Sequence, residues 1–140
     1  IGDIIQRLSK IFSDNSIRYD LDILNVEIFA DPMLEKAFYN LIDNSVRHGE
    51  HVTRIYIHSE HRENGISLIY TDDGIGIPDS NKERIFEKGF GKNSGQGMFL
   101  VRTILQISHI TIKETGVHGE GARFELFVPD GVWREGKENI

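Results

Sequence analysis

Apolar residues recur at helical spacing in three segments of the chain. In the first, residues 3–13, they define one helical face: Ile4, Ile5, Leu8, Ile11 and Phe12. The second begins at Asp31-Pro32, an acid followed by proline that is typical of a helix start, and is predicted to end near Gly49. The third is predicted from Met98 to about Ile107, and a shorter helix is predicted over residues 80–88, "SNKERIFEK".

Alternation of apolar and polar residues predicts strands between these helices. Residues 17–28 alternate in two runs, which favours a β-hairpin. Two further strands, 52–60 and 65–72, are joined by the polar turn "HRENG", and two more are expected at 110–115 and 122–129. Strands mixed with three helices predict an α/β (α+β) two-layer sandwich, in which about three helices cover one face of the sheet.

Length, composition and charge exclude several classes of function. The 140 residues suit one domain, assigned to 1–130, followed by a polar and loosely ordered tail at 131–140. A net charge of -6 argues against a broad electrostatic grip on nucleic acid or anionic lipid. The absence of cysteine excludes disulfides and thiolate chemistry. Because the sequence starts at Ile1 without an initiator methionine, we expect it to be a piece of a longer protein.

The helix predicted at 31–49 carries a polar stripe beside its apolar face. The apolar face consists of Leu34, Ala37, Phe38, Leu41, Ile42 and Ser45. The stripe consists of Asn40, Asn44, Arg47 and His48, at spacings of four, three and one. Asparagine carbonyl oxygens are suitable ligands for a hard cation such as Mg²⁺. Taken alone, the stripe is better interpreted as an ordinary solvated helix face.

The stretch "YTDDGIGIP", residues 70–78, places acids and then glycines directly after a strand. A carboxylate at a strand end, here Asp72 or Asp73, can accept a hydrogen bond from an exocyclic amine such as that of adenine. Gly74 and Gly76 allow the backbone to bend tightly or to approach a flat ring. The alternative is a simple β-turn, for which Asp-Gly and a nearby proline are common signals.

A second glycine-rich stretch, "GFGKNSGQGMFLV" at 89–101, precedes the third long helix. Amides at a helix N-terminus form a ready phosphate site, and Lys92 adds a cation. The alternative is a flexible connector. The stretch is not a P-loop, because no Gly-Lys-Ser/Thr run precedes the helix, and no strand leads into it as in a Rossmann fingerprint.

These motifs, in this order, resemble the catalytic ATP-binding domain of sensor histidine kinases, within the gyrase/Hsp90/histidine kinase/MutL superfamily. "NLIDNSVRHG" (40–49) resembles the N box and "DDGIGIP" (72–78) the G1 box. "RIFEKGF" (84–90) resembles the F box and "GQGMFLV" (95–101) the G2 box, and "GEGARFELFVP" matches the closing turn and strand. The match runs from about residue 20 to 130. It implies a Bergerat-type fold with a mixed, mainly antiparallel sheet.

The resemblance also implies roles for individual residues. Asp72 would accept from the adenine amino group, in a pocket shaped by Gly74, Gly76 and Ile77, with Met98 near the base. Asn44 would be the Mg²⁺ ligand. Asn40, Arg47 and His48 would contact the phosphates and the sugar. Lys92, Gly95 and Gly97 would line the lid that covers the phosphates. Asn40, Asn44, Arg47 and Arg84 are the implied catalytic residues, with Arg84 at a phosphate or at the interface with the phosphate acceptor. Phe86 and Phe90 would anchor the root of the lid.

The function implied is that of a cytoplasmic catalytic module of a two-component sensor kinase. It would bind ATP or ADP with Mg²⁺ and pass the γ-phosphate to a histidine on a phosphoacceptor (dimerisation) domain, and thence to a response regulator. No contact with nucleic acid or membrane is expected. The alternatives are an ATP hydrolase or anti-sigma serine kinase of the same superfamily, or a nucleotide-sensing module that transfers no phosphate. Hydrolytic members have a glutamate where this chain has Asn40.

The chain departs from the family pattern in three places. The stretch between the F box and Gly95 is short, and "SHITI" (108–112) lacks the two glycines usual after the G2 helix. No phosphate-accepting histidine motif is present in these 140 residues. The pairs His48/His51 and His58/His61 have a spacing that could suit a metal, but no third ligand is spaced to join them, so surface histidines are the preferred interpretation.

Overall fold

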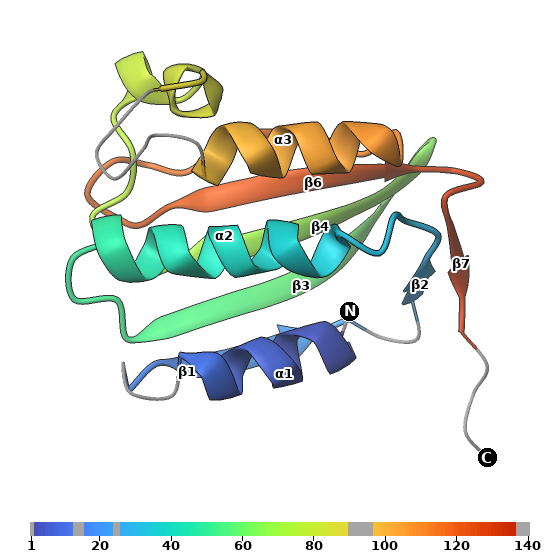
Figure 1. The fold of residues 1–140 in the computed structure, drawn as a ribbon, viewed down its shortest axis with the longest axis horizontal. Helices are drawn as coiled ribbons and strands as arrows, with labels where there is room; N and C mark the ends of the chain where they lie inside the picture. The colour runs from blue at the N-terminus through green and yellow to red at the C-terminus, as the bar shows by residue number, and fades with distance from the viewer. Residues whose placement is uncertain (1, 13–15, 24–25, 90–96, 137–140) are drawn as a thin grey trace.

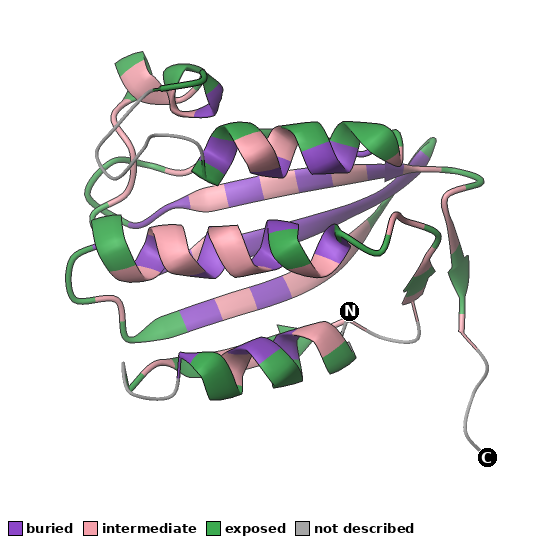
Figure 2. Ribbon diagram, in the orientation of Figure 1, coloured by how far each residue is buried: buried purple, intermediate pink, exposed green. Residues whose placement is uncertain are grey.

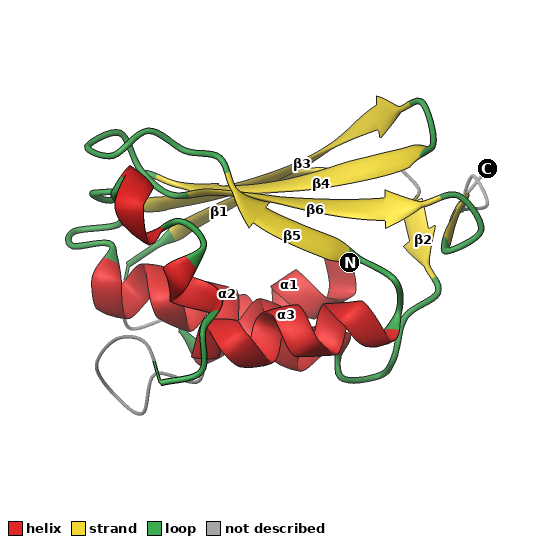
Figure 3. Cartoon of the chain, turned by 90° about the horizontal axis from the view of Figure 1, so that it is seen from above, coloured by secondary structure: helices red, strands yellow, loops and turns green. Residues whose placement is uncertain are grey.

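A computed structural model describes residues 2–12, 16–23, 26–89 and 97–136. Three helices lie on one face of a five-stranded sheet (Figures 1 and 3): α1 (Gly2–Ile11), α2 (Leu34–His48) and α3 (Gly97–Ile107). The sheet order is β1-β3-β4-β6-β5. The strands are β1 (Arg18–Asp22), β3 (Arg54–Arg62), β4 (Gly65–Asp72), β5 (Thr111–Glu114) and β6 (Arg123–Pro129). The β1–β3 pair is parallel and the other three pairs are antiparallel, so the predicted two-layer, mainly antiparallel sandwich is confirmed.

The core lies between the helices and the sheet (Figure 2). Four neighbouring side chains of α2 are at most 1% exposed: Ala37, Phe38, Leu41 and Ile42. From the sheet, Phe124, Leu126 and Val128 of β6 alternate with half-buried residues, as expected for a strand with one face in the core. Burying a large apolar side chain contributes roughly 1.5–3 kcal/mol. Helix α2 is therefore tightly packed against the sheet, and this packing fixes the positions of the polar residues along its edge.

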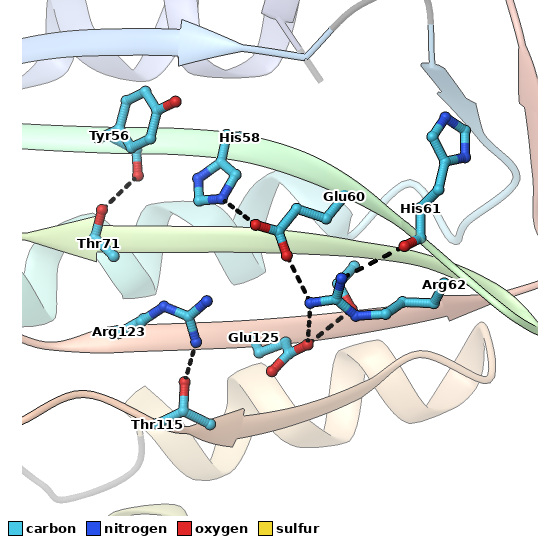
Figure 4. A network of polar contacts seen from close by, with 10 residues as sticks. Tyr56, His58, Glu60, His61, Arg62, Thr71, Thr115, Arg123 and Glu125 are labelled. Atoms are coloured by element: carbon cyan, nitrogen blue, oxygen red, sulfur yellow. Dashed lines mark hydrogen bonds and ion pairs between the residues drawn. The ribbon is translucent and has the colours of Figure 1, made fainter.

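The other face of the sheet is covered by polar side chains (Figure 4). Arg62 donates from Nη2 to Glu60 at 2.7 Å and to Glu125 at 3.1 Å, and Ser67 donates to Glu125 at 2.9 Å. Such ion pairs near the surface contribute little stability individually. Glu60, Arg62, Ser67 and Glu125 are paired with one another across three strands, whereas the buried Nδ1 of His58 has no hydrogen-bond partner among the described residues.

The hairpin predicted at 17–28 is wrong. Strand β1 pairs with β3 in parallel, and helix α2 makes the connection between them. The second half of the segment forms β2 (Val26–Ile28), which pairs antiparallel with β7 (Trp133–Glu135). An alternating pattern determines which side chains face the core, but it does not determine which strand lies alongside.

The same pairing corrects the expectation of a loosely ordered tail. Residues 133–135 are a strand, and Trp133 packs against the core cluster. Its ring meets that of His61 edge-on at 5.9 Å, and Arg134 forms an ion pair with Glu27 at 2.6 Å. The polar composition of residues 131–140 suggested a loose tail, but Trp133 packs against the core and holds the segment in place.

The single short helix predicted at 80–88 is instead two one-turn 3₁₀ helices, η2 (Asp79–Asn81) and η3 (Arg84–Phe86). Between them, Lys82 turns inward, and its ammonium donates to the carbonyl of Ile77 at 3.1 Å. Short 3₁₀ turns of this kind are common as connectors.

Helix α3 ends in a left-handed turn made without glycine. Ile110 donates its backbone N–H to Leu105 at 3.0 Å and His109 donates to Gln106 at 3.0 Å, which is the Schellman pattern. His109, at the position usually occupied by glycine, has φ of 62°. The turn that follows this helix is therefore formed even though residues 108–112 lack the two glycines usual in the family. It requires a histidine to adopt the left-handed backbone conformation, which is energetically unfavourable.

Replacing His109 with glycine should stabilise the domain. Removing the strain of a left-handed histidine should raise the free energy of unfolding by about 1–2 kcal/mol. The greater conformational freedom of glycine in the unfolded chain should lower it by about 0.4–1 kcal/mol, so we expect a net increase of about 0.5–1 kcal/mol. Urea unfolding followed by circular dichroism measures it. His118→Gly is the matched control, because His118 is exposed and has no positive φ. A His109→Gly variant less stable than the parent would contradict this account.

Candidate nucleotide-binding site

The centre of the site is Asp72, the last residue of β4, which is only 7% exposed. Its Oδ1 accepts hydrogen bonds from the backbone N–H groups of Gly74 and Ala122, both at 3.0 Å. Its Oδ2 accepts from the Ser45 hydroxyl at 2.7 Å. A carboxylate offers about four acceptor positions. Three are used within the protein, and the remaining one, on Oδ2, can receive an amine.

A chain of hydroxyl groups supports this carboxylate from helix α2. Because Ser45 donates its proton to Asp72, its oxygen accepts from the Tyr70 hydroxyl, 2.7 Å away. The Tyr70 hydroxyl also lies 3.2 Å from the Leu41 carbonyl. Burial raises the pKa of Tyr70 well above its usual value, so the phenol remains a proton donor. Ser45 lies on the buried face of α2, as its spacing predicts, but no sequence pattern indicated that it would bond to Asp72.

The loop that follows Asp72 is packed against the end of α2. Ile75 donates its N–H to the Gly49 carbonyl at 2.8 Å, and a Cβ on Gly74 would lie 2.3 Å from that same oxygen. Gly76 has φ of 76°, which favours glycine. The loop is therefore more than a simple β-turn, because close approach at Gly74 and left-handed backbone at Gly76 both require glycine.

Asp73 fastens the same loop to the start of β3. Its Oδ1 accepts from the N–H groups of Thr53 at 2.8 Å and Arg54 at 3.0 Å, and its Oδ2 accepts from the Thr53 hydroxyl. Partial burial by itself would raise the pKa of Asp73, but the hydrogen bonds from Thr53 and Arg54 outweigh it, and the net pKa is lowered. Of the two acids at the start of the loop, Asp73 therefore has a structural role, whereas Asp72 can still accept one more hydrogen bond.

The polar stripe of α2 lies along the edge that faces the start of α3. Asn40 donates from Nδ2 to the carbonyl of Gly97 at 3.4 Å, so it joins the two helices. Asn44, one turn later, is half-buried, and its side chain has no hydrogen-bond partner among the described residues. Arg47 is exposed and forms an ion pair with Asp43 at 2.9 Å, and His48 is exposed at the helix end.

An unpaired amide at this edge fits a magnesium ion. Mg²⁺ takes oxygen ligands, retains several waters and commonly completes its shell with substrate phosphates, so one protein amide oxygen is a sufficient anchor. Among the residues that the structure describes, no group of three His, Cys, Asp or Glu side chains could hold a metal. His58 instead lies 3.2 Å from Glu60 on the open face of the sheet (Figure 4), and His61 contacts Trp133.

The F-box segment is anchored through Phe86, which is 4% exposed. Its ring meets Phe124 of the sheet edge-on at 6.3 Å, and the Arg102 guanidinium of α3 lies 3.9 Å from its centre. Arg102 also bonds to Glu83 at 3.0 Å and to the Ile112 carbonyl at 3.0 Å. Phe86 is thus held in the core, whereas Arg84 is exposed beside it.

Several predicted site residues belong to the lid region, 90–96. Lys92, Gly95 and Phe90 lie outside the described residues. Gly97 is the first residue of α3, and Met98 is buried at 7% exposure within the core cluster. Ile77 is half-buried and packs against the same cluster. Helix α2 thus contacts both parts of the site, because Asn40 bonds to the first residue of α3 and Ser45, five residues later, bonds to Asp72.

Comparison with known proteins supports the class defined by this fold and these motifs. Residues 30–132 match the family model described as "Histidine kinase-, DNA gyrase B-, and HSP90-like ATPase". The chain therefore belongs to this ATPase family, and the resemblance inferred from the four motifs is confirmed.

Particular relatives are named as sensor kinases. The chain is 32% identical over 138 residues to the adaptive-response sensory kinase SasA of Prochlorococcus marinus subsp. pastoris, covering 91% of this chain and 36% of that protein. It spans about a third of the length of such curated relatives. Among the described residues, none of the helices has the length and apolar character needed to cross a bilayer.

Solved structures share the fold. The mycobacterial sensor histidine kinase MprB superposes with a TM-score of 0.78 at 19% identity, covering 91% of this chain and 93% of that one. Full-length ShkA, solved in complex with AMPPNP, gives a TM-score of 0.74 at 17% identity and covers 91% of this chain and 30% of that one. The fold of a histidine kinase catalytic domain is thereby shown.

The bonds made by Asp73 predict a pH dependence of stability. Because its pKa is lowered in the folded state, the ionised group stabilises the fold above the ordinary carboxyl range, and this contribution is lost as the pH falls through the folded-state pKa. Asp73→Asn should therefore be less stable than the parent at neutral pH, and the difference should shrink as the pH falls below the ordinary carboxyl pKa of about 4 towards the lowered folded-state pKa. Urea unfolding across a pH series measures it.

The control is Asp130→Asn, since Asp130 is exposed and its side chain makes no hydrogen bond within the described residues. A stability gap between the parent and Asp73→Asn that stayed constant with pH would show that the Asp73 charge is not responsible.

Proposed function

We propose that this domain binds Mg²⁺-ATP and donates the γ-phosphate to a histidine on a separate phosphoacceptor domain. The observation that carries the proposal is the buried Asp72 carboxylate, with three acceptor positions satisfied by Ser45, Gly74 and Ala122 and one left over on Oδ2. A buried acceptor that is positioned from three sides suits the amino group of adenine. The shape of the base pocket is assigned to Gly74, Gly76 and Ile77, with Met98 nearby.

The phosphate end of the nucleotide is assigned to the edge between α2 and α3. Asn44 would hold Mg²⁺, which would supply charge neutralisation at the phosphates when bound. Asn40, Arg47 and His48 would lie along the phosphates and sugar. The N-terminus of α3, which begins at Gly97, directs its first amides and the positive end of its dipole towards this edge, and Lys92 and Gly95 would complete the lid.

Positioning and charge neutralisation account for most of phosphoryl transfer, so a kinase domain of this kind needs no base of its own for water. Asn40 is a neutral amide, and the family resemblance places a glutamate there in hydrolytic members. The nearby acids are already engaged, because Glu35 pairs with Arg7 at 2.7 Å and Asp43 pairs with Arg47 at 2.9 Å. This favours a histidine kinase over an ATP hydrolase or an anti-sigma serine kinase. The remaining alternative, a nucleotide-sensing module that transfers no phosphate, is separated from a kinase by a transfer assay.

The partners follow from the class of protein. The acceptor histidine would belong to a dimerisation domain of the same protein, and the phosphate would then pass to a response regulator. Arg84, exposed beside the anchored Phe86, is assigned to a phosphate or to the interface with the acceptor. Because the substrate is ATP, the domain would work in the cytoplasm, and it would contact neither nucleic acid nor membrane.

Asp72 should control the choice of base. Guanine presents a carbonyl where adenine presents an amine, so two acceptors would face each other in a buried site and affinity should fall by orders of magnitude. We expect calorimetry to show binding of ATP and ADP and very little binding of GTP. Asp72→Asn should bind neither well, while its amide oxygen still accepts from Gly74 and Ala122 and preserves the fold.

The matched control is Asp73→Asn, because the neighbouring carboxylate is bonded to Thr53 and Arg54 and should not affect base choice. Comparable affinities of the parent for ATP and GTP would exclude this role of Asp72.

Phosphotransfer should depend on the acceptor and on Asn44. With Mg²⁺ and radiolabelled ATP, the chain alone should release negligible phosphate and acquire no acid-labile label, because general-base catalysis worth about two to four orders of magnitude is missing. Adding a phosphoacceptor domain of a similar sensor kinase should place label on its histidine. Asn44→Ala should keep its circular dichroism spectrum but lose the Mg²⁺-dependent part of ATP binding.

Two results would redirect the assignment. Vigorous hydrolysis by the unmutated chain, lost in Asn44→Ala, would favour the ATP hydrolase. Tight binding without transfer to any histidine acceptor would favour the nucleotide-sensing module. If Asn40→Glu still binds Mg²⁺-ATP, a raised hydrolysis rate would support the interpretation of position 40.

A further inference from the structure

Lys82 is half-buried between the two 3₁₀ turns and uses all three of its ammonium protons within the protein. Its Nζ donates to Glu114 Oε1 at 2.5 Å, to the Gly116 carbonyl at 2.9 Å and to the Ile77 carbonyl at 3.1 Å. The Lys82 side chain is 19% exposed and that of Glu114 is 0% exposed. No motif in the sequence singled out either residue.

Glu114 extends the connection to the neighbouring strand. Its Oε1 accepts from the backbone N–H of Gly116 at 2.6 Å, and its Oε2 accepts from that of Arg123 at 3.3 Å. The Lys82–Glu114 pair therefore joins three segments: the loop at 73–78, the end of β5 with the turn at 115–121, and the start of β6.

Two of these segments also meet at Asp72. The turn reaches it directly, because Ala122 donates to Asp72 Oδ1 and a Cβ on Gly121 would lie 2.0 Å from the Asp72 carbonyl oxygen. The loop reaches it through Gly74, which donates to the same Oδ1. The loop and the turn also contact each other, since Gly119 donates to the Ile75 carbonyl at 2.6 Å. Lys82 thus sets the spacing between the two backbone segments that hold the Asp72 carboxylate.

We propose that Lys82 is a positioning residue for the nucleotide base site: it holds the 73–78 loop and the 115–121 turn in register, so that Asp72 Oδ2 is aimed at the base. This inference rests on the proposed function of Asp72. A buried ion pair by itself is a weak source of stability and is often replaceable by neutral groups. The directional bonds from the ammonium to the Ile77 and Gly116 carbonyls are not replaceable in that way.

The test uses Lys82→Met and the double variant Lys82→Met/Glu114→Gln. The single variant leaves a buried carboxylate unpaired and should lower the melting temperature, whereas the double variant removes both charges and should recover much of that loss. Neither variant restores the two bonds to the loop and the turn. Both should therefore bind Mg²⁺-ATP about tenfold more weakly, measured by calorimetry well below each melting temperature so that unfolding does not contribute.

A site-specific readout accompanies the affinity. In ¹⁵N-resolved NMR spectra without nucleotide, the amide resonances of Gly74 and Ala122 report their hydrogen bonds to Asp72, and we expect both to shift and to exchange faster with solvent in the two variants. Lys113→Met is the matched control. Lys113 precedes Glu114 on the same strand but is exposed on the opposite face, so affinity and both resonances should be unchanged.

The outcomes separate this inference from the proposed function. A double variant that recovers stability and binds ATP within twofold of the parent, with the Gly74 and Ala122 resonances unmoved, would overturn the role of Lys82 and leave that of Asp72 intact. A parent chain that binds no ATP would refute the proposed function. The NMR comparison would then still decide whether Lys82 positions the loop.

Discussion

A carboxylate that is 7% exposed is costly to bury, because its charge loses water, and it is tolerated only where enough donors replace that water. At Asp72 the donors come from three places that are distant in the sequence: Ser45 on α2, Gly74 in the following loop and Ala122 before β6. Satisfying this one group requires the helix, the loop and the turn to converge on the end of β4. The arrangement of the proposed nucleotide site follows from that requirement.

The glycines of the region are explained by the same convergence. The loop crosses the end of α2 so closely that Gly74 has no room for a side chain beside the Gly49 carbonyl. The turn passes the Asp72 backbone just as closely at Gly121, which has φ of 121°. In both places a glycine allows two backbones to touch, and the contact brings their N–H groups within reach of the carboxylate.

Periodicity was sufficient to predict the layers, because side-chain alternation and helical spacing record burial directly. The three long helices could be predicted in this way from residues 3–13, 31–49 and 98–107, and the β3–β4 hairpin from residues 52–72. Strand partners could not, since β1 and β2 have the pattern of a hairpin yet pair with β3 and β7. At the site, the acidic and amide residues were identified from motif spacing. Ser45, Tyr70, Lys82 and Glu114 were not, because their roles depend on which segments meet across the fold.

The two-stranded sheet of β2 and β7 joins parts of the chain that are far apart in sequence, with Glu27 and Arg134 separated by 107 residues. Among the described residues, three residue pairs form its register, from Val26↔Glu135 to Ile28↔Trp133. Closing so long a loop costs conformational entropy, and few contacts return it, so this sheet should form late in folding and open first in native-state hydrogen exchange. It lies at the opposite end of the molecule from the η2–η3 segment (Figure 1). Local opening there would leave the bonds around Asp72 unbroken, so the domain has a region of low local stability that is separate from its nucleotide end.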